Sequence, residues 1–506
     1  MLFNSPLFLL VFLPLTLICF FAAGRWRGSE DAIGVLLIAS LIFYAAAGLF
    51  NLGLFLTSMI VNFILGALIV RFYRRRWYLA TLGVVLNLSF IGFFKYSGLL
   101  VGTADHMLGT AWKVPSVALP IGISFYTFQK IAYLLDAYKD GQAESRFRRY
   151  ALFVAFFPQL IAGPIVHPRE VLPQFGRRNI GRFRIDDFAI GLVFLLFGLF
   201  KKTFLADGSA VFATPIFDGV YTGHLPTVFE AWGGVLAYTF QIYFDFSGYS
   251  DMAVGLARMF GIRLPFNFNS PYKAANLVDF WRCWHMTLSR FLRDYVYIPL
   301  GGNRKGKVRR YINLMLTMLI GGLWHGANWT FVVWGGLHGL GLIVNHLWRA
   351  VRGDRPPARG LTRLACKIAT FGFVVIAWTF FRAVSFSGAR AMFRGMVGLY
   401  GLLPTSPVPV TGWAADAVKF FAGSGAHAVE TGMLIEILWL LGLLLIALTL
   451  PNTQEFILGA GRRPLARLSW RPSPAWAACL GIGFGTALTY YIAVQNHVSE
   501  FIYFRF

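Results

Sequence analysis

The sequence contains few charged residues for its length. Only 13% of its 506 residues are Asp, Glu, Lys or Arg, against roughly a quarter in an average soluble domain. Acidic residues are the scarcest, with 22 Asp and Glu against 46 Lys and Arg. The four scattered cysteines form neither a disulfide framework nor the spacing of a metal site. Together with a hydrophobic fraction of 57%, these absences exclude an ordinary soluble domain and indicate a polytopic membrane protein.

Several motifs of soluble enzymes are also missing. No G-x-S-x-G and no H-E-x-x-H occurs, which argues against a serine hydrolase and a zinc protease. The run 301–307 is one residue short of a phosphate-binding loop, and Val308 stands where that loop needs Ser or Thr. The net charge of +24 lies in short clusters between apolar runs. We therefore expect these clusters to anchor loops at the lipid surface, and we expect no nucleic acid and no metal.

Apolar runs long enough to enter a bilayer recur along the whole chain. We predict spans at 5–23, 33–49, 53–71, 78–95, 120–135, 188–204, 229–247, 250–260, 364–381, 432–450 and 475–494. Because Arg25 and Arg27 follow the first run and no charge precedes it, we expect an uncleaved span with the N-terminus outside, not a signal peptide. The sequence therefore predicts one all-α integral membrane domain over 1–506, with N-terminal spans in 1–115, a core in 116–348 and C-terminal spans in 349–506.

Three segments between these spans are not predicted to cross the membrane. The stretch 153–166 is short for a span, and basic clusters lie on both sides of it. A re-entrant segment that enters and leaves on the cytoplasmic side fits both facts. Non-helical backbone at membrane depth needs protein or a water-filled cavity around it, so this segment hints at a cavity. We expect a polar outer loop at 97–115 and an interfacial helix at 385–400.

The stretch 311–348 has no Lys, Arg, Asp or Glu over 38 residues. As one helix it would be about 57 Å long, nearly twice the roughly 30 Å hydrocarbon core. Basic clusters flank both ends, so the positive-inside rule places both ends in the cytoplasm. The stretch is therefore predicted to be a hairpin with His325 near its bend, about 22 Å along the helix from Arg310. An ionisable residue at such depth is a candidate functional residue.

The stretch 276–297 precedes this hairpin and has helical periodicity. Its apolar residues recur every three or four positions, and its other faces carry Arg282, Arg290, Arg293 and Asp294. We predict one amphipathic helix at the membrane interface or along a cavity. His285 lies on the flank of the apolar stripe, a position that favours a surface or interface histidine.

Acidic residues inside apolar sequence are few and need partners. Asp245 and Asp251 lie in the run QIYFDFSGYSDM, together with Tyr249. We expect them to pair with cations, with the basic residues of 276–297 as candidates, and channel lining is their second possible role.

Two interpretations of His325 follow from the pattern. A neutral imidazole in a dry channel can take a proton from a hydroxyl that attacks an acyl group. Alternatively, the histidine makes hydrogen bonds between helices, as buried polar groups in membranes often do. Trp324, Asn328 and Trp329 could supply polar contacts and cavity walls. His338 is 13 residues further and would point about 220° away on one continuous helix, so packing is favoured for it.

Long motifs in this region closely resemble the membrane-bound O-acyltransferase (MBOAT) family, in particular its bacterial alginate O-acetyltransferase branch. The motifs are YSDMAVGLARMFGIRLPFNFNSPYKAANLVDFWRCWHMTLSRFLRDYVYIPLGGNRKG, GGLWHGANWTFVVWGGLHG, PIGISFYTFQ, FFPQLIAGPIVHP, the opening MLFNSPLFLLVFLPL and the ending FIYFRF. The resemblance therefore extends from end to end of the chain. It implies the MBOAT-type fold, with about 10–13 transmembrane or re-entrant helices around a central tunnel.

The resemblance also implies roles for individual residues. His325 of the WHGAN motif matches the catalytic histidine, and His285 of WH-x-x-LS matches the family's second polar position in the same tunnel. Further expected tunnel or substrate-lining residues are Trp324, Asn328, Trp284, Asp251, Tyr249 and Ser289. Basic residues that could attract the donor's phosphates at the cytoplasmic mouth are Arg304, Lys305 and Lys307. They could equally be simple topology anchors.

For this branch the resemblance implies an acetyltransferase of the bacterial cell inner membrane. Acetyl-CoA is the expected donor, and no bound cofactor is expected. The acetyl group is expected to pass to periplasmic acetyltransferase partners that modify an exopolysaccharide such as alginate. Two alternatives stay open: transfer of another acyl group, such as D-alanyl, on the same fold, or a polysaccharide or lipid transporter in which His325 and the aspartates relay protons.

Overall fold

The computed structural model describes residues 1–110, 112, 118–353, 359–404, 410–422, 427–459, 470–494 and 499–502. These residues form helices, turns and irregular segments and no β-strand, which confirms the predicted all-α class. They fall into two compact units. The last four letters of the terminal motif FIYFRF lie outside the described residues.

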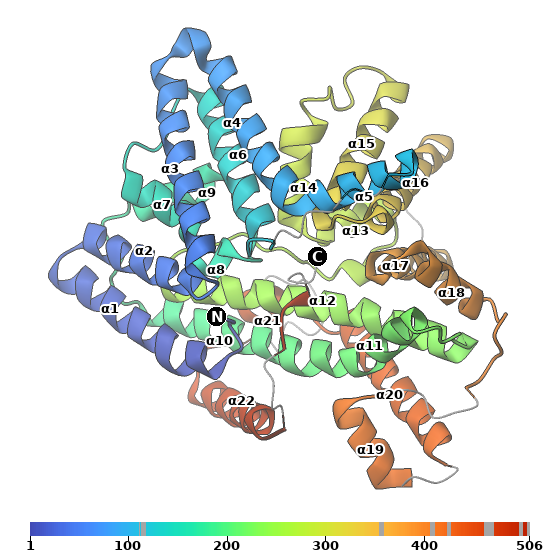
Figure 1. Cartoon of the computed structure of the whole chain (residues 1–506). Helices are drawn as coiled ribbons and strands as arrows, with labels where there is room; N and C mark the ends of the chain where they lie inside the picture. The colour runs from blue at the N-terminus through green and yellow to red at the C-terminus, as the bar shows by residue number, and fades with distance from the viewer. Residues whose placement is uncertain are drawn as a thin grey trace. The chain divides into compact units, whose positions relative to one another are not determined.

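The first unit comprises Met1–Leu199, Tyr249–Phe266 and Trp470–Arg505. Its helices are η1 (Phe8–Phe12), α1 (Leu13–Trp26), α2 (Ser29–Ala45), α3 (Leu49–Arg71), η2 (Tyr73–Arg75), α4 (Arg76–Ile91), η3 (Gly92–Tyr96), α5 (Ser97–Leu108), α6 (Ile123–Asp140), α7 (Phe147–Ala155), α8 (Phe157–Leu160), α9 (Pro168–Phe175), α10 (Ile185–Phe200), the end of α12 (Val228–Met259) and α22 (Pro474–Val494). Helices α3, α4 and α6 pack side by side (Figure 1).

The core of the first unit is aromatic and surrounds the segment predicted to be re-entrant. Phe157 lies against Phe3, Phe8 and Phe43, with ring centroids 5.6 to 6.4 Å apart. The helix is interrupted at Phe156, between α7 and α8. Every residue from 153 to 166 is buried. The prediction of a broken segment surrounded by protein is confirmed, while the side from which it enters the membrane stays a prediction.

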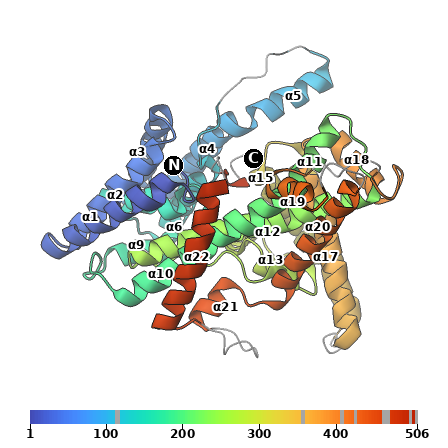
Figure 2. The same cartoon turned by 90° about the horizontal axis from the view of Figure 1, so that it is seen from below.

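The second unit comprises Phe200–Gly248 and Asn267–Ser469. Its helices are η4 (Lys201–Ala206), α11 (Asp207–Tyr221), the first part of α12, η5 (Pro271–Lys273), α13 (Leu277–Cys283), α14 (Met286–Leu292), η6 (Arg293–Tyr297), α15 (Lys307–His325), α16 (Trp329–Arg352), α17 (Gly360–Arg382), α18 (Phe386–Met396), α19 (Gly412–Ala422), α20 (Ala428–Thr449) and α21 (Thr453–Leu458). Helices α15 and α16 form an antiparallel pair with α17 beside α16, and α19 lies along α20 (Figures 1 and 2).

Seven helical segments of the described residues are long and apolar enough to cross a membrane. They are Phe8–Trp26, Leu49–Arg71, Tyr73–Leu108, Ile185–Tyr221, Trp329–Arg352, Gly360–Arg382 and Ala428–Thr449. The multi-pass prediction is confirmed. The helix expected within 385–400 is present as α18, whereas its interfacial position stays a prediction.

Two predicted boundaries are wrong. The segment 97–108 is helical and continues η3 as α5, so the polar outer loop is shorter than predicted. The spans predicted at 229–247 and 250–260 are one helix of 32 residues, α12. Gly248 and its serine neighbours do not end this helix, because residues 242–250 are all buried and their backbone groups need the hydrogen bonds of a continuous helix.

The hairpin of α15 and α16 depends on glycines at its contact. A Cβ on Gly322 would collide with the carbonyl oxygen of Phe331, and a Cβ on Gly335 would collide with that of Met318. Small residues at such positions let two membrane helices approach closely. The predicted hairpin is confirmed, with its bend directly after His325.

Substituting these glycines by alanine tests the close contact. Gly335→Ala should lower the thermal stability of the detergent-purified protein, because overpacking a tight contact costs about 1–3 kcal/mol. Gly336→Ala is the matched control: its Cβ would meet only Leu319 Cδ2 at 3.6 Å, an ordinary contact. We expect its melting temperature to equal or exceed that of the wild type, since alanine favours helix by about 1 kcal/mol. Equal melting temperatures for both variants would contradict the close contact.

Candidate functional site

The helix predicted over 276–297 is broken at Trp284 and His285. Helix α13 ends at Cys283, α14 begins at Met286, and His285 between them has a φ of 41°. This left-handed conformation is uncommon for residues other than glycine. The side chain of His285 is also fully buried. The predictions of one continuous helix and of a surface histidine are therefore wrong.

Hydrogen bonds to an extended segment hold this break. The N–H of Met286 donates to the carbonyl of Asn267 over 2.9 Å, and the N–H of Asn269 donates to the carbonyl of Cys283 over 2.9 Å. The hydroxyl of Ser289, a predicted site residue, donates to the carbonyl of Trp284 over 3.4 Å. These contacts replace bonds that a continuous helix would make, so the helix stops at His285.

Asn267 fixes which nitrogen of His285 carries the proton. Its Oδ1 accepts from the Thr287 hydroxyl over 2.8 Å and from the Thr287 N–H over 3.4 Å, and it lies 2.9 Å from His285 Nδ1. Because a backbone N–H can only donate, this Asn267 atom is the oxygen, and Nδ1 must donate to it. Burial lowers the pKa of His285 to about 3. The neutral ring therefore carries its proton on Nδ1 and has an unprotonated Nε2, which has no hydrogen-bond partner among the described residues.

His325 is the last residue of α15 and lies at the inner end of the hairpin. Asn328 begins α16: its Oδ1 accepts from the N–H of Thr330 over 3.0 Å, and its Nδ2 donates to the carbonyl of Val384 over 2.6 Å. Asn328 thus fixes the turn after His325 and uses both ends of its amide to do so. Its predicted contact with substrate stays a prediction.

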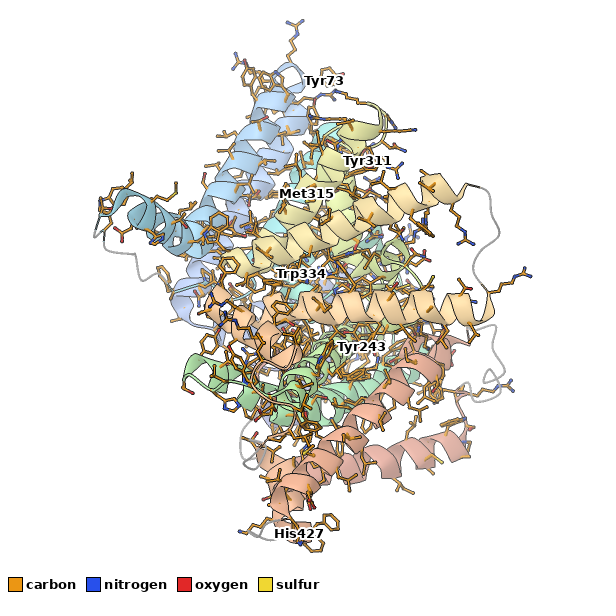
Figure 3. All side chains as sticks on the ribbon, turned by 90° about the vertical axis from the view of Figure 1, so that its right-hand side faces the viewer. Tyr73, Tyr243, Tyr311, Met315, Trp334 and His427 are labelled. Carbon is orange, nitrogen blue, oxygen red and sulfur yellow. The ribbon has the colours of Figure 1, made fainter. Side chains whose placement is uncertain are left out.

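Aromatic rings surround His325. The ring centroids of Trp324, Trp334 and Phe381 lie 4.9, 5.1 and 5.1 Å from that of His325. The centroid of His285 is 6.3 Å from that of His325, although the two residues are 40 positions apart in the sequence. The side chain of Phe246 packs edge-on against His285 at 4.6 Å. Figure 3 shows Trp334 among the interior side chains. The second unit therefore brings both predicted catalytic histidines into one buried aromatic cluster.

His338 lies on the other side of Trp334, with ring centroids 4.9 Å apart. His338 therefore packs within the aromatic cluster, and the separation of about 220° from His325 expected on one continuous helix does not apply, because the two histidines lie on different helices. Its Nδ1 accepts a hydrogen bond of 3.3 Å from Trp281 Nε1. Besides Nε2 of His285, the buried nitrogens of this cluster without a hydrogen-bond partner among the described residues include His338 Nε2, Trp334 Nε1 and Trp284 Nε1. An unsatisfied buried donor costs roughly 1–3 kcal/mol.

The remaining predicted site residues lie elsewhere. Tyr249 and Asp251 belong to the first unit, where Tyr249 stacks on Phe3 at 4.8 Å and on Phe501 at 4.6 Å. The three basic residues of the proposed donor mouth lie in the exposed segment before and at the start of α15: Arg304, Lys305 and Lys307.

Asp245 has a partner that the sequence did not predict. Its carboxylate lies 2.9 Å from Nζ of Lys202, which is also 2.7 Å from Asp207. The cation of this pair comes from η4, which lies outside the 276–297 region. The described residues contain no group of three His, Cys, Asp or Glu side chains that could hold a metal ion. The chemistry supplied by the cluster itself is that of imidazoles and indoles.

At least four residues of this site were missed in the sequence. Phe246 of α12, Trp334 of α16 and Phe381 of α17 pack against the two histidines, and Asn267 contacts His285 from the segment before η5. Asn267 lies in the run FNFNSP, whose turn signals give no indication of a contact with His285. Phe381 is one of many phenylalanines in apolar helices, so no signal distinguishes it.

Comparison with known proteins identifies the family. The profile of the membrane-bound O-acyltransferase family matches residues 145–386, which include both histidines. A peptidoglycan O-acetyltransferase of Helicobacter pylori is 41% identical over 79% of this chain and 81% of its own length. The chain belongs to the membrane-bound O-acyltransferase family. It is a multi-pass membrane acyltransferase.

Other relatives carry different names. A probable alginate O-acetylase of Pseudomonas aeruginosa is 43% identical over 78% of this chain and 75% of its own length. This confirms the resemblance to the alginate branch. A teichoic acid D-alanyltransferase of Streptococcus thermophilus is 27% identical over 47% of this chain and 60% of its own length.

Removing the side chain of Asn267 should disturb His285 without touching His325. We expect Asn267→Ala to lower acyl transfer by membranes containing the variant at least about tenfold, because a misplaced catalytic group can cost about 10²-fold. Asn269→Ala is the control, since the side chain of Asn269 accepts from Asn452 instead. Full activity of Asn267→Ala at normal protein abundance would contradict the orienting role.

Proposed function

We propose that this protein transfers acetyl groups from cytoplasmic acetyl-CoA across the bacterial inner membrane for O-acetylation of an exopolysaccharide such as alginate. The observation that carries the proposal is the pair of buried histidines, His285 and His325, in one aromatic cluster. Relatives of more than 40% identity named as O-acetyltransferases support acetyl as the transferred group.

His325 is the general base of this proposal. As the acceptor hydroxyl oxygen bonds to the thioester carbonyl carbon, its proton passes to the imidazole of His325. Collapse of the tetrahedral intermediate breaks the carbon–sulfur bond, and the leaving thiolate takes that proton from the imidazolium. Charge and redox state are therefore unchanged overall. A dry, aromatic environment strengthens each of these electrostatic interactions.

His285 positions the acceptor in this mechanism. Its proton is held on Nδ1 by Asn267, so Nε2 is a hydrogen-bond acceptor. A second O–H or N–H of the acceptor that donates to Nε2 of His285 would hold the reacting hydroxyl close to His325, because the two rings are 6.3 Å apart. The two histidines thus have different tasks: His285 orients the acceptor through this second group, and His325 takes the proton of the reacting hydroxyl.

The direction of transfer rests on charge and permeability. A charged nucleotide thioester does not enter the bilayer, whereas a small acetyl group meets its acceptor within the protein. Arg304, Lys305 and Lys307 would attract the phosphates of acetyl-CoA. Periplasmic acetyltransferase partners would then receive the acetyl group and modify the polysaccharide.

A second acceptor class has specific support. The Helicobacter pylori relative is named for peptidoglycan and is nearly as similar as the relatives named for alginate. Peptidoglycan is therefore the second candidate polymer. D-alanyl transfer has weaker support, because the relative with that name matches only 47% of the chain.

Removing the imidazole of His325 tests the enzyme. In cells, His325→Ala should reduce O-acetylation of the polymer at least about 100-fold, the range of general-base catalysis, while the protein accumulates normally. His427→Ala is the control, since His427 lies exposed at the tip of the α19 and α20 pair (Figure 3). Persistent acetylation would refute His325 as the base. Loss of polymer from the cell exterior would instead favour the transporter.

Neutralising the basic segment tests the donor. The triple substitution Arg304→Gln, Lys305→Gln and Lys307→Gln should raise the KM for acetyl-CoA several-fold at low salt and leave kcat nearly unchanged. The reason is that exposed charges act over distance and are screened by salt. The difference from the wild type should therefore shrink in high salt. An unchanged KM at low salt would leave these residues as topology anchors.

A further inference from the structure

The two ring nitrogens of His338 have different surroundings. An indole N–H can only donate, so the 3.3 Å contact from Trp281 Nε1 makes Nδ1 of His338 an acceptor. The proton of the neutral ring is therefore on Nε2. This assignment is opposite to that of His285, whose proton is on Nδ1.

The Nε2–H of His338 has no acceptor among the described residues, and the residue is fully buried. The ring cannot easily turn to find one. It lies nearly parallel to Phe280, with 10° between the planes, and the edge contacts of Trp281 and Phe373 enclose it. A buried polar hydrogen in a native fold normally has a partner, so a group from outside the chain is expected there.

Two neighbouring indole rings also have a buried N–H without an acceptor among the described residues. These groups are Nε1 of Trp334 and Nε1 of Trp284. Both indoles pack on Trp378, at 5.7 and 4.9 Å. The part of the cluster around His338 therefore presents donors, whereas Nε2 of His285 is an acceptor, and a ligand beside His338 must supply acceptors. The rings around His338 are those of Phe280, Trp281, Trp334, Phe373 and Trp378, which carry no charge to balance an anion. Neutral carbonyl oxygens fit best.

We propose that His338 binds the acyl donor, with its Nε2–H donating to an amide carbonyl of the arm that carries the thioester. Trp334 lies between the rings of His338 and His325, at 4.9 and 5.1 Å. A carbonyl at His338 is therefore not the one attacked beside His325, and the arm of coenzyme A has amide carbonyls further from the sulfur. This inference rests on the proposed function, because it assigns a binding residue for that donor.

Binding to the full chain in detergent micelles tests this proposal. The probes are acetyl-CoA and adenosine 3′,5′-bisphosphate, which is the nucleotide without the arm. In His338→Phe, the preference for acetyl-CoA over the nucleotide should fall roughly tenfold, as for loss of one hydrogen bond. His338→Gln retains an N–H donor and should keep most of the preference. His427→Phe is the control, and His338→Met replaces the phenylalanine variant if that variant does not fold.

Each outcome decides the proposal. An unchanged preference in His338→Phe or His338→Met overturns the role of His338. An equal loss in His338→Gln also overturns it, because ring shape and not the N–H would then matter. If the wild type binds no acetyl-CoA, the proposed donor is wrong, and the role of His338 falls with it. If His325→Ala abolishes transfer while His338→Phe keeps the wild-type preference, the proposed function stands and only the inference about His338 fails.

Discussion

The backbone hydrogen bonds between 267–269 and 283–286 are the constraint on which the site depends. The sequence of 276–297 favours a single helix, and a single helix would leave His285 on its flank. Pairing with the extended segment breaks the helix at His285 instead and gives this residue a φ of 41°. The side chain then points into the unit, where Asn267 fixes its proton on Nδ1. One local interruption therefore sets the position and the protonation of the ring.

A second helix interruption, between α15 and α16, brings His325 close to His285. Helix α15 ends at His325, and Asn328 starts α16 after a short turn. The glycine contacts of Gly322 and Gly335 keep the two helices close, so that Trp334 reaches the ring of His325. Both histidines thus lie at helix interruptions, where side chains can be aimed without following the helical periodicity. Large aromatic rings surround both of them, and both side chains are buried.

The sequence allowed the hairpin to be predicted, because its signals are local. They are a charge-free run too long for one span, glycines within it and basic clusters at both ends. The break at His285 could not be predicted, since it depends on hydrogen bonds to a segment with no corresponding pattern. The partner of Asp245 was missed for the same reason: Lys202 lies in a different helix, 43 positions upstream. The family resemblance predicted that His285 lies close to His325, whereas the helical periodicity favoured a position at the surface or interface.

Hydrogen bonds from neighbouring residues give the buried histidines different donor and acceptor atoms. Asn267 leaves His285 with an acceptor nitrogen and Trp281 leaves His338 with a donor, and neither atom has a partner among the described residues. Binding of the two substrates uses both: an acceptor nitrogen for an O–H or N–H of the acceptor molecule, and a donor N–H for a carbonyl oxygen of the donor's arm. His325 lies between these two environments, in contact with His285 on one side and with Trp334 on the other. Neutral rings of fixed tautomer can provide this asymmetry without placing a charge in a dry interior.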